Sequence, residues 1–244
     1  MQSSIPSKNK TVLITRAKEQ SDDMIHLLEK NGFDIVALPL IQFQAINASQ
    51  LLSVFHSTLF NWIIFTSTNT VKFFLKTILP SNLSGVKIAA VGKKTAQLLE
   101  DEGLDVSVIP SDFTADALGK AIPVLSHEKV FIPHSALSSN NLQEQLEAKN
   151  AAVQTLAIYD NHAVNYSKEE LSSLLPTTID VVTFTSGSCV KAYVANNIHL
   201  PKAKIVCIGP STAKVAQEMN LVVDVIPEEY TVEGMVNSIK QLFP

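Results

Sequence analysis

The sequence has few of the residues that hold metals, disulfides or nucleic acids. It contains only two cysteines among 244 residues, Cys189 and Cys207, and its histidines do not fall at metal-ligand spacing. The formal net charge of −4 argues against nucleic acid as a partner, because proteins that bind it usually carry a basic excess. We therefore predict a reducing compartment, no metal ion and two buried thiols.

Long apolar runs are also missing. No run approaches the ~20 residues that a helix needs to span a bilayer. The first ten residues, Met1 to Lys10, are polar and have no apolar stretch behind them, so they do not resemble a secretory signal. We expect these residues to form a frayed tail. The absences together predict a cytoplasmic protein that does not bind membranes.

Three signatures of cofactor and nucleophile chemistry are absent as well. The sequence has no G-x-G-x-x-G, no G-x-x-x-x-G-K-[ST] and no G-x-S-x-G motif. The serine cluster Thr185-Ser186-Gly187-Ser188 has no partnered histidine. It therefore favours a helix cap or an anion-binding loop over a nucleophile. The sequence predicts a site without cofactor or metal.

The chain repeats itself at an interval of 117 to 119 residues. Three blocks recur in the same order: Phe65-Thr66-Ser67 as Phe184-Thr185-Ser186, Gly92-x-x-Thr95-Ala96 as Gly209-x-x-Thr212-Ala213, and Val108-Ile109-Pro110 with Thr114 as Val225-Ile226-Pro227 with Thr231. Between them, Phe113 corresponds to Tyr230. Ordered blocks at nearly one interval indicate a duplicated domain, since a solenoid unit is much shorter.

Short apolar runs alternate with helix-length segments in both halves. The runs are Val12–Ile14, Ile35–Leu38, Trp62–Phe65, Ile88–Val91, Val106–Ile109, Val130–Ile132, Val153–Ile158, Val181–Phe184, Ile205–Ile208 and Val222–Ile226. Runs without strict alternation are typical of strands covered on both faces, as in a parallel sheet. Two helix-length segments, Asp22–Asn31 and Lys93–Glu102, end at a glycine that can stop a helix. We predict two doubly wound α/β domains with parallel sheets.

Two segments fit neither a helix nor a packed strand, namely Leu40–Ala48 and Ile158–Val164. They are also equivalent in the repeat. If both cross between the domains, residues 1–39 and 165–244 form one discontinuous domain and residues 49–157 form the other. Two contiguous halves are an interpretation that the sequence leaves open.

The repeated blocks lie where a ligand is expected. In open α/β sheets, ligands bind beyond the carboxyl ends of the strands, and a helix that begins there offers free amides to anions. Each Ser or Thr taken alone is more simply an N-cap worth ~1 kcal/mol. As a set, the hydroxyls of both halves are expected to face one another across an interdomain cleft and to receive a large polyanion.

Arg16 is the only arginine in the chain and follows the first predicted strand. At a strand end, its guanidinium can meet a carboxylate through two parallel hydrogen bonds. The alternative interpretation is a surface charge without function.

These blocks together resemble the uroporphyrinogen-III synthase family from Val12 to the C-terminus. The matching motifs are Ile14-Thr15-Arg16, Phe65-Thr66-Ser67-x-Asn69-x-Val71, Val91-Gly92-x-x-Thr95-Ala96, Ala115-Asp116-x-Leu118, Tyr159 after a strand, Phe184-Thr185-Ser186-x-Ser188-x-Val190, Ile208-Gly209-Pro210-x-Thr212-Ala213 and Tyr230-Thr231-x-Glu233-Gly234. Each motif alone is weak, but their order and spacing are specific.

The resemblance implies two flavodoxin-like domains joined by a two-stranded linker, with the active site between them. The implied substrate is hydroxymethylbilane, a linear tetrapyrrole with eight carboxylates. A monomeric, cytoplasmic enzyme would cyclise it to uroporphyrinogen III, losing water and inverting ring D, without a cofactor. Tyr159 would protonate the departing hydroxyl. The substrate would be held by Arg16, Thr66, Ser67, Asn69, Gly92, Thr95, Thr185, Ser186, Ser188, Gly209, Thr212 and Thr231.

One position departs from the family pattern. Pro133-His134-Ser135 stands where many relatives carry an arginine, so a carboxylate contact is either missing or supplied by His134 or Lys129. Two alternatives to the synthase remain at this point. One is a non-catalytic two-domain module that binds tetrapyrroles or small anions, and the other is a flavodoxin-like flavin protein.

Overall fold

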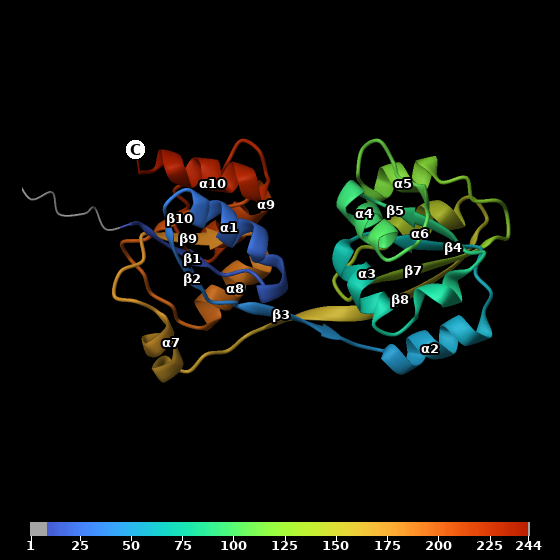
Figure 1. The fold of residues 1–244 in the computed structure, drawn as a ribbon, viewed down its shortest axis with the longest axis horizontal. Helices are drawn as coiled ribbons and strands as arrows, with labels where there is room; N and C mark the ends of the chain where they lie inside the picture. The colour runs from blue at the N-terminus through green and yellow to red at the C-terminus, as the bar shows by residue number, and fades with distance from the viewer. Residues whose placement is uncertain (1–8, 244) are drawn as a thin grey trace, which may run out of the picture. The chain divides into compact units, whose positions relative to one another are not determined.

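The computed structural model describes residues 9–243 and divides the chain into two compact α/β units (Figure 1). The first unit contains the chain up to Gln42 and again from His162, and the second unit is Phe43–Asn161. Residues 1–8 of the predicted N-terminal tail lie outside the described residues. Within residues 9–243, no helix is long and apolar enough to cross a membrane.

The first unit contains a parallel sheet whose strand order is β10-β9-β1-β2. Its strands are β1 (Thr11–Ile14), β2 (Asp34–Ala37), β9 (Val181–Phe184) and β10 (Lys204–Cys207). The two central strands, β1 and β9, are buried at every residue. Their sequences, apolar except for Thr11 and Thr183, follow from this burial, because helices cover both faces of the sheet.

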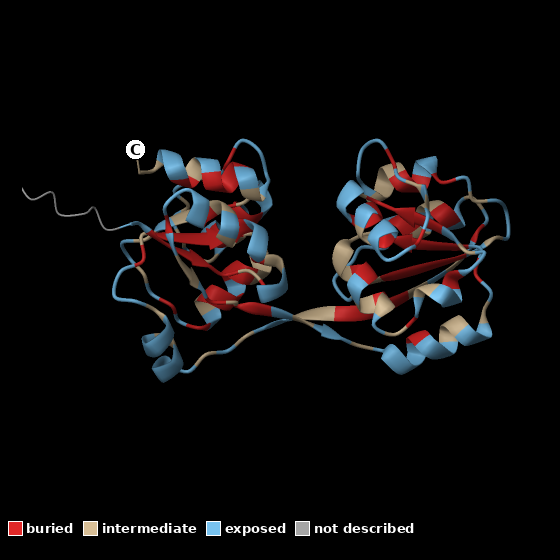
Figure 2. Cartoon of the chain, viewed as in Figure 1, coloured by how far each residue is buried: buried red, intermediate tan, exposed pale blue. Residues whose placement is uncertain are grey.

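The helices of the first unit are η1 (Lys18–Gln20), α1 (Asp22–Lys30), α7 (Lys168–Leu174), α8 (Gly187–Ala195), α9 (Pro210–Glu218) and α10 (Val232–Gln241). Four of them, α1, α8, α9 and α10, have buried residues, whereas η1 and α7 have none. Met24 and Leu28 of α1 and Met235 of α10 share a buried cluster with β1. The strands at the centre of the sheet are red, the colour of buried residues, in Figure 2. The predicted stop after α1 is confirmed, because Gly32 adopts a left-handed φ of 80°.

The second unit contains a mainly parallel sheet of six strands in the order β3-β8-β7-β4-β5-β6. Its elements are β3 (Ile41–Ala45), α2 (Ala48–Ser57), β4 (Trp62–Phe65), α3 (Thr68–Leu75), η2 (Pro80–Leu83), β5 (Lys87–Ala90), α4 (Lys93–Asp101), β6 (Val106–Val108), α5 (Ala115–Ala121), β7 (Lys129–Ser135), α6 (Asn141–Glu147) and β8 (Ala152–Ala163). Along β4, Ile63 and Phe65 enter one core cluster, whereas Trp62 and Ile64 enter another. This sheet is therefore also packed on both faces.

The predicted α/β class and most predicted strands are confirmed, but the strand at Val222–Ile226 is wrong. Only Val225 forms an isolated parallel bridge, with Val206 of β10. Val222 is 80% exposed, so the start of the segment gains nothing by packing. Pro227 follows and has no N–H with which to continue a ladder.

The two segments expected to fit no packed strand also need correction. Residues 41–45 form β3 at the edge of the six-stranded sheet, and β8 continues to Ala163. The Ile46 amide donates to the Ile158 carbonyl over 3.0 Å, and the Val164 amide donates to the Leu40 carbonyl over 2.8 Å. The chain leaves the first unit within β3 and returns within β8. The polar end of β8 lacks the apolar pattern by which buried strands are predicted.

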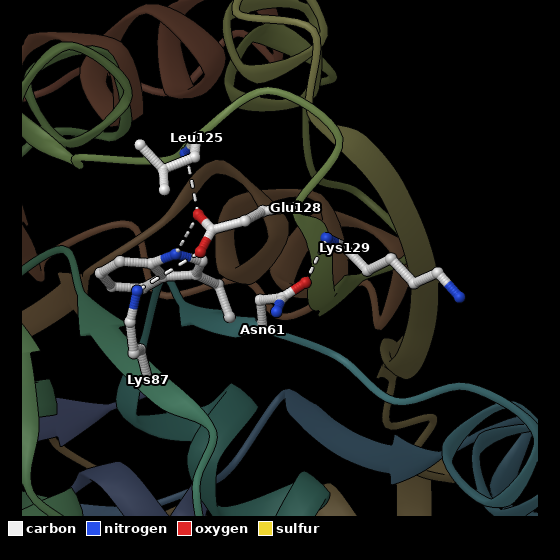
Figure 3. A network of polar contacts seen from close by, with 6 residues as sticks. Asn61, Lys87, Leu125, Glu128 and Lys129 are labelled. Atoms are coloured by element: carbon white, nitrogen blue, oxygen red, sulfur yellow. Dashed lines mark hydrogen bonds and ion pairs between the residues drawn. The ribbon is translucent and has the colours of Figure 1, made fainter.

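A polar network closes the amino-terminal edge of the second sheet (Figure 3). The Glu128 carboxylate accepts hydrogen bonds from the Leu125 amide over 2.8 Å, from Trp62 Nε1 over 2.9 Å and from Lys87 Nζ over 3.3 Å. The Leu125 hydrogen bond is the main cause that holds the pKa of Glu128 below its ordinary value. Hydrogen bonds among its own residues hold this edge together. The candidate site lies at the opposite edge, where the strands end.

Candidate functional site

The candidate residues follow parallel strands, so those within one unit lie at one edge of its sheet. In the second unit, Thr66 and Ser67 follow β4, and Gly92 follows the neighbouring β5. In the first unit, Arg16 follows β1, the Thr185–Ser188 segment follows β9, and Gly209 follows β10. The repeat therefore gives both units the same kind of edge.

Four of the singled-out hydroxyls are helix N-caps. The hydroxyl oxygens of Ser67, Thr114, Ser186 and Thr231 accept hydrogen bonds from the backbone amides of Thr70, Ala117, Cys189 and Gly234 over 3.0 to 3.3 Å. The local interpretation from the sequence is therefore confirmed for them. Each hydroxyl keeps a proton that it can donate, but part of its accepting capacity is used by its own helix.

The two Gly-x-x-Thr loops differ from these caps. Gly92 and Gly209 begin α4 and α9 without any side-chain cap. The first amides of a helix have no intrahelical partner, so these two helix starts can offer them to an anion. Helices α1, α2 and α6 also begin without a side-chain cap hydrogen bond, but they do not follow a Gly-x-x-Thr strand end. Thr95 and Thr212 lie in the first turns and are 5% and 3% exposed.

Gly92 has no evident role in the fold. Its φ of −136° is extended backbone that any residue adopts. A Cβ atom added there meets nothing within 4 Å. The missing side chain instead leaves the backbone bare at the end of β5, where a ligand could approach it closely.

Gly209 is different, because its neighbourhood is filled. A Cβ atom added there would lie 3.3 Å from the ring of Tyr230. The absence of a side chain at Gly209 is thus explained by packing, whereas the absence at Gly92 is not.

Four polar residues occupy matching places at the starts of α3 and α8. Thr66 and Asn69 in the second unit, and Thr185 and Ser188 in the first, are all half-buried. Half-buried polar groups at strand ends can contact a ligand and still be positioned by the scaffold.

Arg16 is half-buried, and its Nε atom is buried with no hydrogen-bond partner among residues 9–243. Burial lowers the pKa of its guanidinium, while charge interactions with Cys189 and Asp23 oppose the shift. A fully solvated surface charge would show neither feature. A buried donor without an acceptor is costly, which favours the interpretation that Arg16 meets an anion.

Tyr159 lies near the end of the predicted apolar part of β8 and is only 6% exposed. Its ring stacks on Phe73 of α3, with ring centroids 5.0 Å apart and planes inclined by 10°. Phe43 of β3 meets it edge-on at 5.9 Å. The phenol oxygen lies 3.3 Å from Ser67 Oγ, so the packed ring brings its oxygen to the end of β4.

A pocket of about 150 Å³ opens at the same edge of the second sheet. Its polar lining includes Thr66, His134, Ser138, Ser139, Asn140, Gln143 and Thr155. The imidazole Nδ1 of His134 lies 2.7 Å from the backbone carbonyl oxygen of Ser135. The sequence prediction missed Ser138, Ser139 and Asn140, because a polar run between elements signals only a turn. The one feature of the sequence that could have indicated a ligand-binding role for these residues is their position just before α6.

The family model for uroporphyrinogen-III synthase HemD matches residues 6–237. A putative uroporphyrinogen-III synthase of Methanocaldococcus jannaschii is 33% identical over 95% of this chain and 98% of that protein. The porphyrin biosynthesis protein HemD of Ruminiclostridium josui is 29% identical over 95% of this chain, which spans only 48% of that longer protein.

The fold agrees with this match. The uroporphyrinogen-III synthetase of Helicobacter pylori has a similar structure, with a TM-score of 0.69, 21% identity, and coverage of 96% of this chain and 100% of that one. The family match favours the synthase over the flavin protein and the non-catalytic module, and the fold is consistent with that match. This chain belongs to the uroporphyrinogen-III synthase family, and its activity is the hydro-lyase step of tetrapyrrole biosynthesis that gives the family its name.

Proposed function

We propose that the chain cyclises hydroxymethylbilane by holding its carboxylates at the two Gly-x-x-Thr loops while Tyr159 assists loss of the hydroxyl. The observation that carries this proposal is the pair of uncapped helix starts, Gly92 and Gly209, at equivalent strand ends. A substrate with eight carboxylates needs many anion contacts. A chain with one arginine must supply most of them from backbone amides and lysines.

Arg16 supplies the strongest single contact in this scheme. Its buried, unpartnered Nε and the rest of its guanidinium can form two parallel hydrogen bonds to one carboxylate. The half-buried polar groups Thr66, Asn69, Thr185 and Ser188 fix the orientation of the substrate. In the pocket of the second unit, His134 takes the place of the arginine that many relatives carry.

Tyr159 acts as a hydrogen-bond donor in the first chemical step. The C–O bond of the terminal hydroxymethyl group breaks with its electron pair on oxygen, while the pyrrole nitrogen supplies electrons and gives an azafulvene. The departing oxygen gains a proton and leaves as water, and the pyrrole N–H gives up its proton, so that the azafulvene is neutral and one water is lost overall. A phenol is a weak acid, so Tyr159 stabilises the charge that develops on the departing oxygen by donating a hydrogen bond to it.

The rest of the reaction needs shape more than acid–base groups. A spirocyclic intermediate inverts ring D before the ring closes, and the aromatic packing around Tyr159 keeps water from this region.

We further propose residues 1–39 with 165–244 and residues 49–157 as the two domains, with linkers at 40–48 and 158–164. The paired strands β3 and β8 support this division. We also propose a monomer that acts in the cytoplasm without a cofactor.

The test is incubation of the purified chain with fresh hydroxymethylbilane, oxidation of the product and separation of uroporphyrin isomers. Spontaneous closure gives isomer I, so we expect an excess of isomer III that grows with protein concentration. Exhaustive chelation should leave this activity unchanged. An isomer ratio equal to that of a protein-free control would contradict the proposed function.

A further inference from the structure

Two exposed aromatic rings occupy equivalent positions of the repeat. Phe113 immediately precedes Thr114, the N-cap of α5, and Tyr230 immediately precedes Thr231, the N-cap of α10. Phe113 is 49% exposed and Tyr230 is 61% exposed. A single exposed aromatic residue needs no explanation, but two at the same place in a duplicated fold suggest a shared use.

The usual structural reason for an apolar residue at this position is not met. A residue just before an N-cap often packs on the fourth residue of the helix as a hydrophobic staple. Those residues are Leu118 and Met235, which are fully buried in the unit cores. Phe113 and Tyr230 keep about half or more of their surface exposed, so such a contact covers at most part of each ring.

Each ring instead lies near one residue of a Gly-x-x-Thr segment. The ring of Tyr230 lies beside Gly209, 3.3 Å from the place of a Cβ atom there. The ammonium of Lys93, the first residue of α4, lies 5.3 Å from the centroid of the Phe113 ring. In the first unit the Tyr230 ring therefore adjoins the uncapped start of α9, and in the second the Phe113 ring is linked to the uncapped start of α4 through the Lys93 side chain.

We propose that Phe113 and Tyr230 each stack on a pyrrole ring of the substrate while the adjoining helix start binds that ring's carboxylates. This inference rests on the proposed function and extends it to the apolar part of the substrate. A linear tetrapyrrole has separate flat rings joined by single carbons, and each ring carries its own acids. An aromatic side chain beside free amides matches both parts of such a ring. Neither residue reacts, so both contribute to binding and not to the chemical step.

The test measures kcat and KM for hydroxymethylbilane and the dissociation constant of uroporphyrinogen III under nitrogen. Phe113→Leu and Tyr230→Leu remove the aromatic face but keep an apolar side chain. Each should raise KM and the dissociation constant about three- to tenfold, with kcat unchanged, as expected for loss of stacking. Tyr230→Phe keeps the ring and should stay within about twofold of the parent chain.

Matched controls come from exposed apolar residues elsewhere in each unit. Leu79 is 64% exposed and Val222 is 80% exposed. Leu79→Ala and Val222→Ala should leave both constants unchanged. Phe113→Trp and Tyr230→Trp should keep binding, and the fluorescence of the new indole should change when uroporphyrinogen III is added.

Several results separate this inference from the proposed function. The stacking would be overturned if Phe113→Leu and Tyr230→Leu bind like the parent chain. It would also be overturned if the fluorescence of the Phe113→Trp and Tyr230→Trp variants does not change when uroporphyrinogen III is added. A Tyr230→Phe variant as weak as Tyr230→Leu would overturn it as well, because the oxygen and not the ring would then matter. If the parent chain makes no isomer III yet binds uroporphyrinogen III through these rings, the proposed function fails and the stacking stands.

Discussion

The two units share the same arrangement of helix starts at strand ends but differ in the side chains placed there. Ser67 and Ser186 are equivalent N-caps at the ends of β4 and β9. In the second unit, Ser67 Oγ also meets the hydroxyls of Thr70 at 2.9 Å and Tyr159 at 3.3 Å. In the first unit, Ser186 Oγ meets the thiol of Cys189 at 3.3 Å. The duplication gave both units the same kind of strand-end edge, and divergence placed a phenol at one of them and Arg16 at the other.

The largest effect should come from removing the phenol oxygen of the second unit. Tyr159→Phe keeps the stack on Phe73 and should lower kcat about 100-fold, at the lower end for positioned proton donors, with little change in melting temperature. Ser186→Ala, a change at the equivalent edge of the first unit, should affect kcat much less. Undiminished isomer III formation by a fully folded Tyr159→Phe chain would make Tyr159 a packing residue only.

The second-largest effect should come from removing the guanidinium of Arg16 in the first unit. Arg16→Gln takes away charge-assisted hydrogen bonds, which contribute ~1.5–3 kcal/mol, so KM should rise about 10- to 100-fold. Arg16→Lys should recover only part of this, because an ammonium cannot form the same parallel pair. Steady-state kinetics decides the matter, and an unchanged KM for Arg16→Gln would return Arg16 to a structural role.

The glycine pair tests the comparison directly. Gly92→Ala meets open space, so its melting temperature should be nearly that of the parent chain, while the new methyl group weakens substrate binding several-fold. Gly209→Ala meets the Tyr230 ring at 3.3 Å and should also lose stability, by about 1 kcal/mol for a mildly overpacked site. Denaturant unfolding and KM should be measured on both variants. A Gly92→Ala chain that unfolds more easily but binds normally would show that the glycine serves the fold.

The smallest effect should be a pH dependence of stability at the amino-terminal edge of the second unit. The folded-state pKa of Glu128 is lowered, so its contribution is present above the unfolded-state value of ~4.3 and is lost as pH falls through the folded-state value. Glu128→Gln should therefore melt below the parent chain at pH 7, and the difference should shrink as the pH falls below ~4. A difference that is constant with pH would exclude ionisation as its cause. Activity at pH 7 should not change, because Glu128 lies at the edge opposite to the candidate site.

Much of the fold could be predicted from the sequence because buried parallel strands leave a direct mark. Trp62–Phe65 and Val181–Phe184 are apolar or small at every position, and the structure buries every one of their residues. The pattern failed where strands are not buried on both faces. Residues 41–45 form an edge strand, and the polar end of β8 is held by hydrogen bonds that leave no apolar pattern.

The candidate site was only partly accessible to the same reasoning. Position at strand ends was predictable from the repeat, since it follows from the order of strands and helices. Whether a hydroxyl caps its own helix was not, because Ser67 and Thr95 look equally suitable in the sequence. The contact between Tyr159 and Ser67 joins residues 92 positions apart, and it depends on the order of strands in the sheet.

Because the chain has a single tryptophan, its tryptophan fluorescence comes from only one of the two units. Trp62 is 2% exposed and lies in the second unit, hydrogen-bonded to Glu128, and the sequence contains no other indole. Intrinsic tryptophan fluorescence therefore does not report unfolding of the first unit, whereas far-ultraviolet circular dichroism reports the helices of both units. If the two signals are followed through one denaturant titration, coincident curves mean that the units unfold together. Separate curves would assign the fluorescent transition to the second unit without any label or mutation.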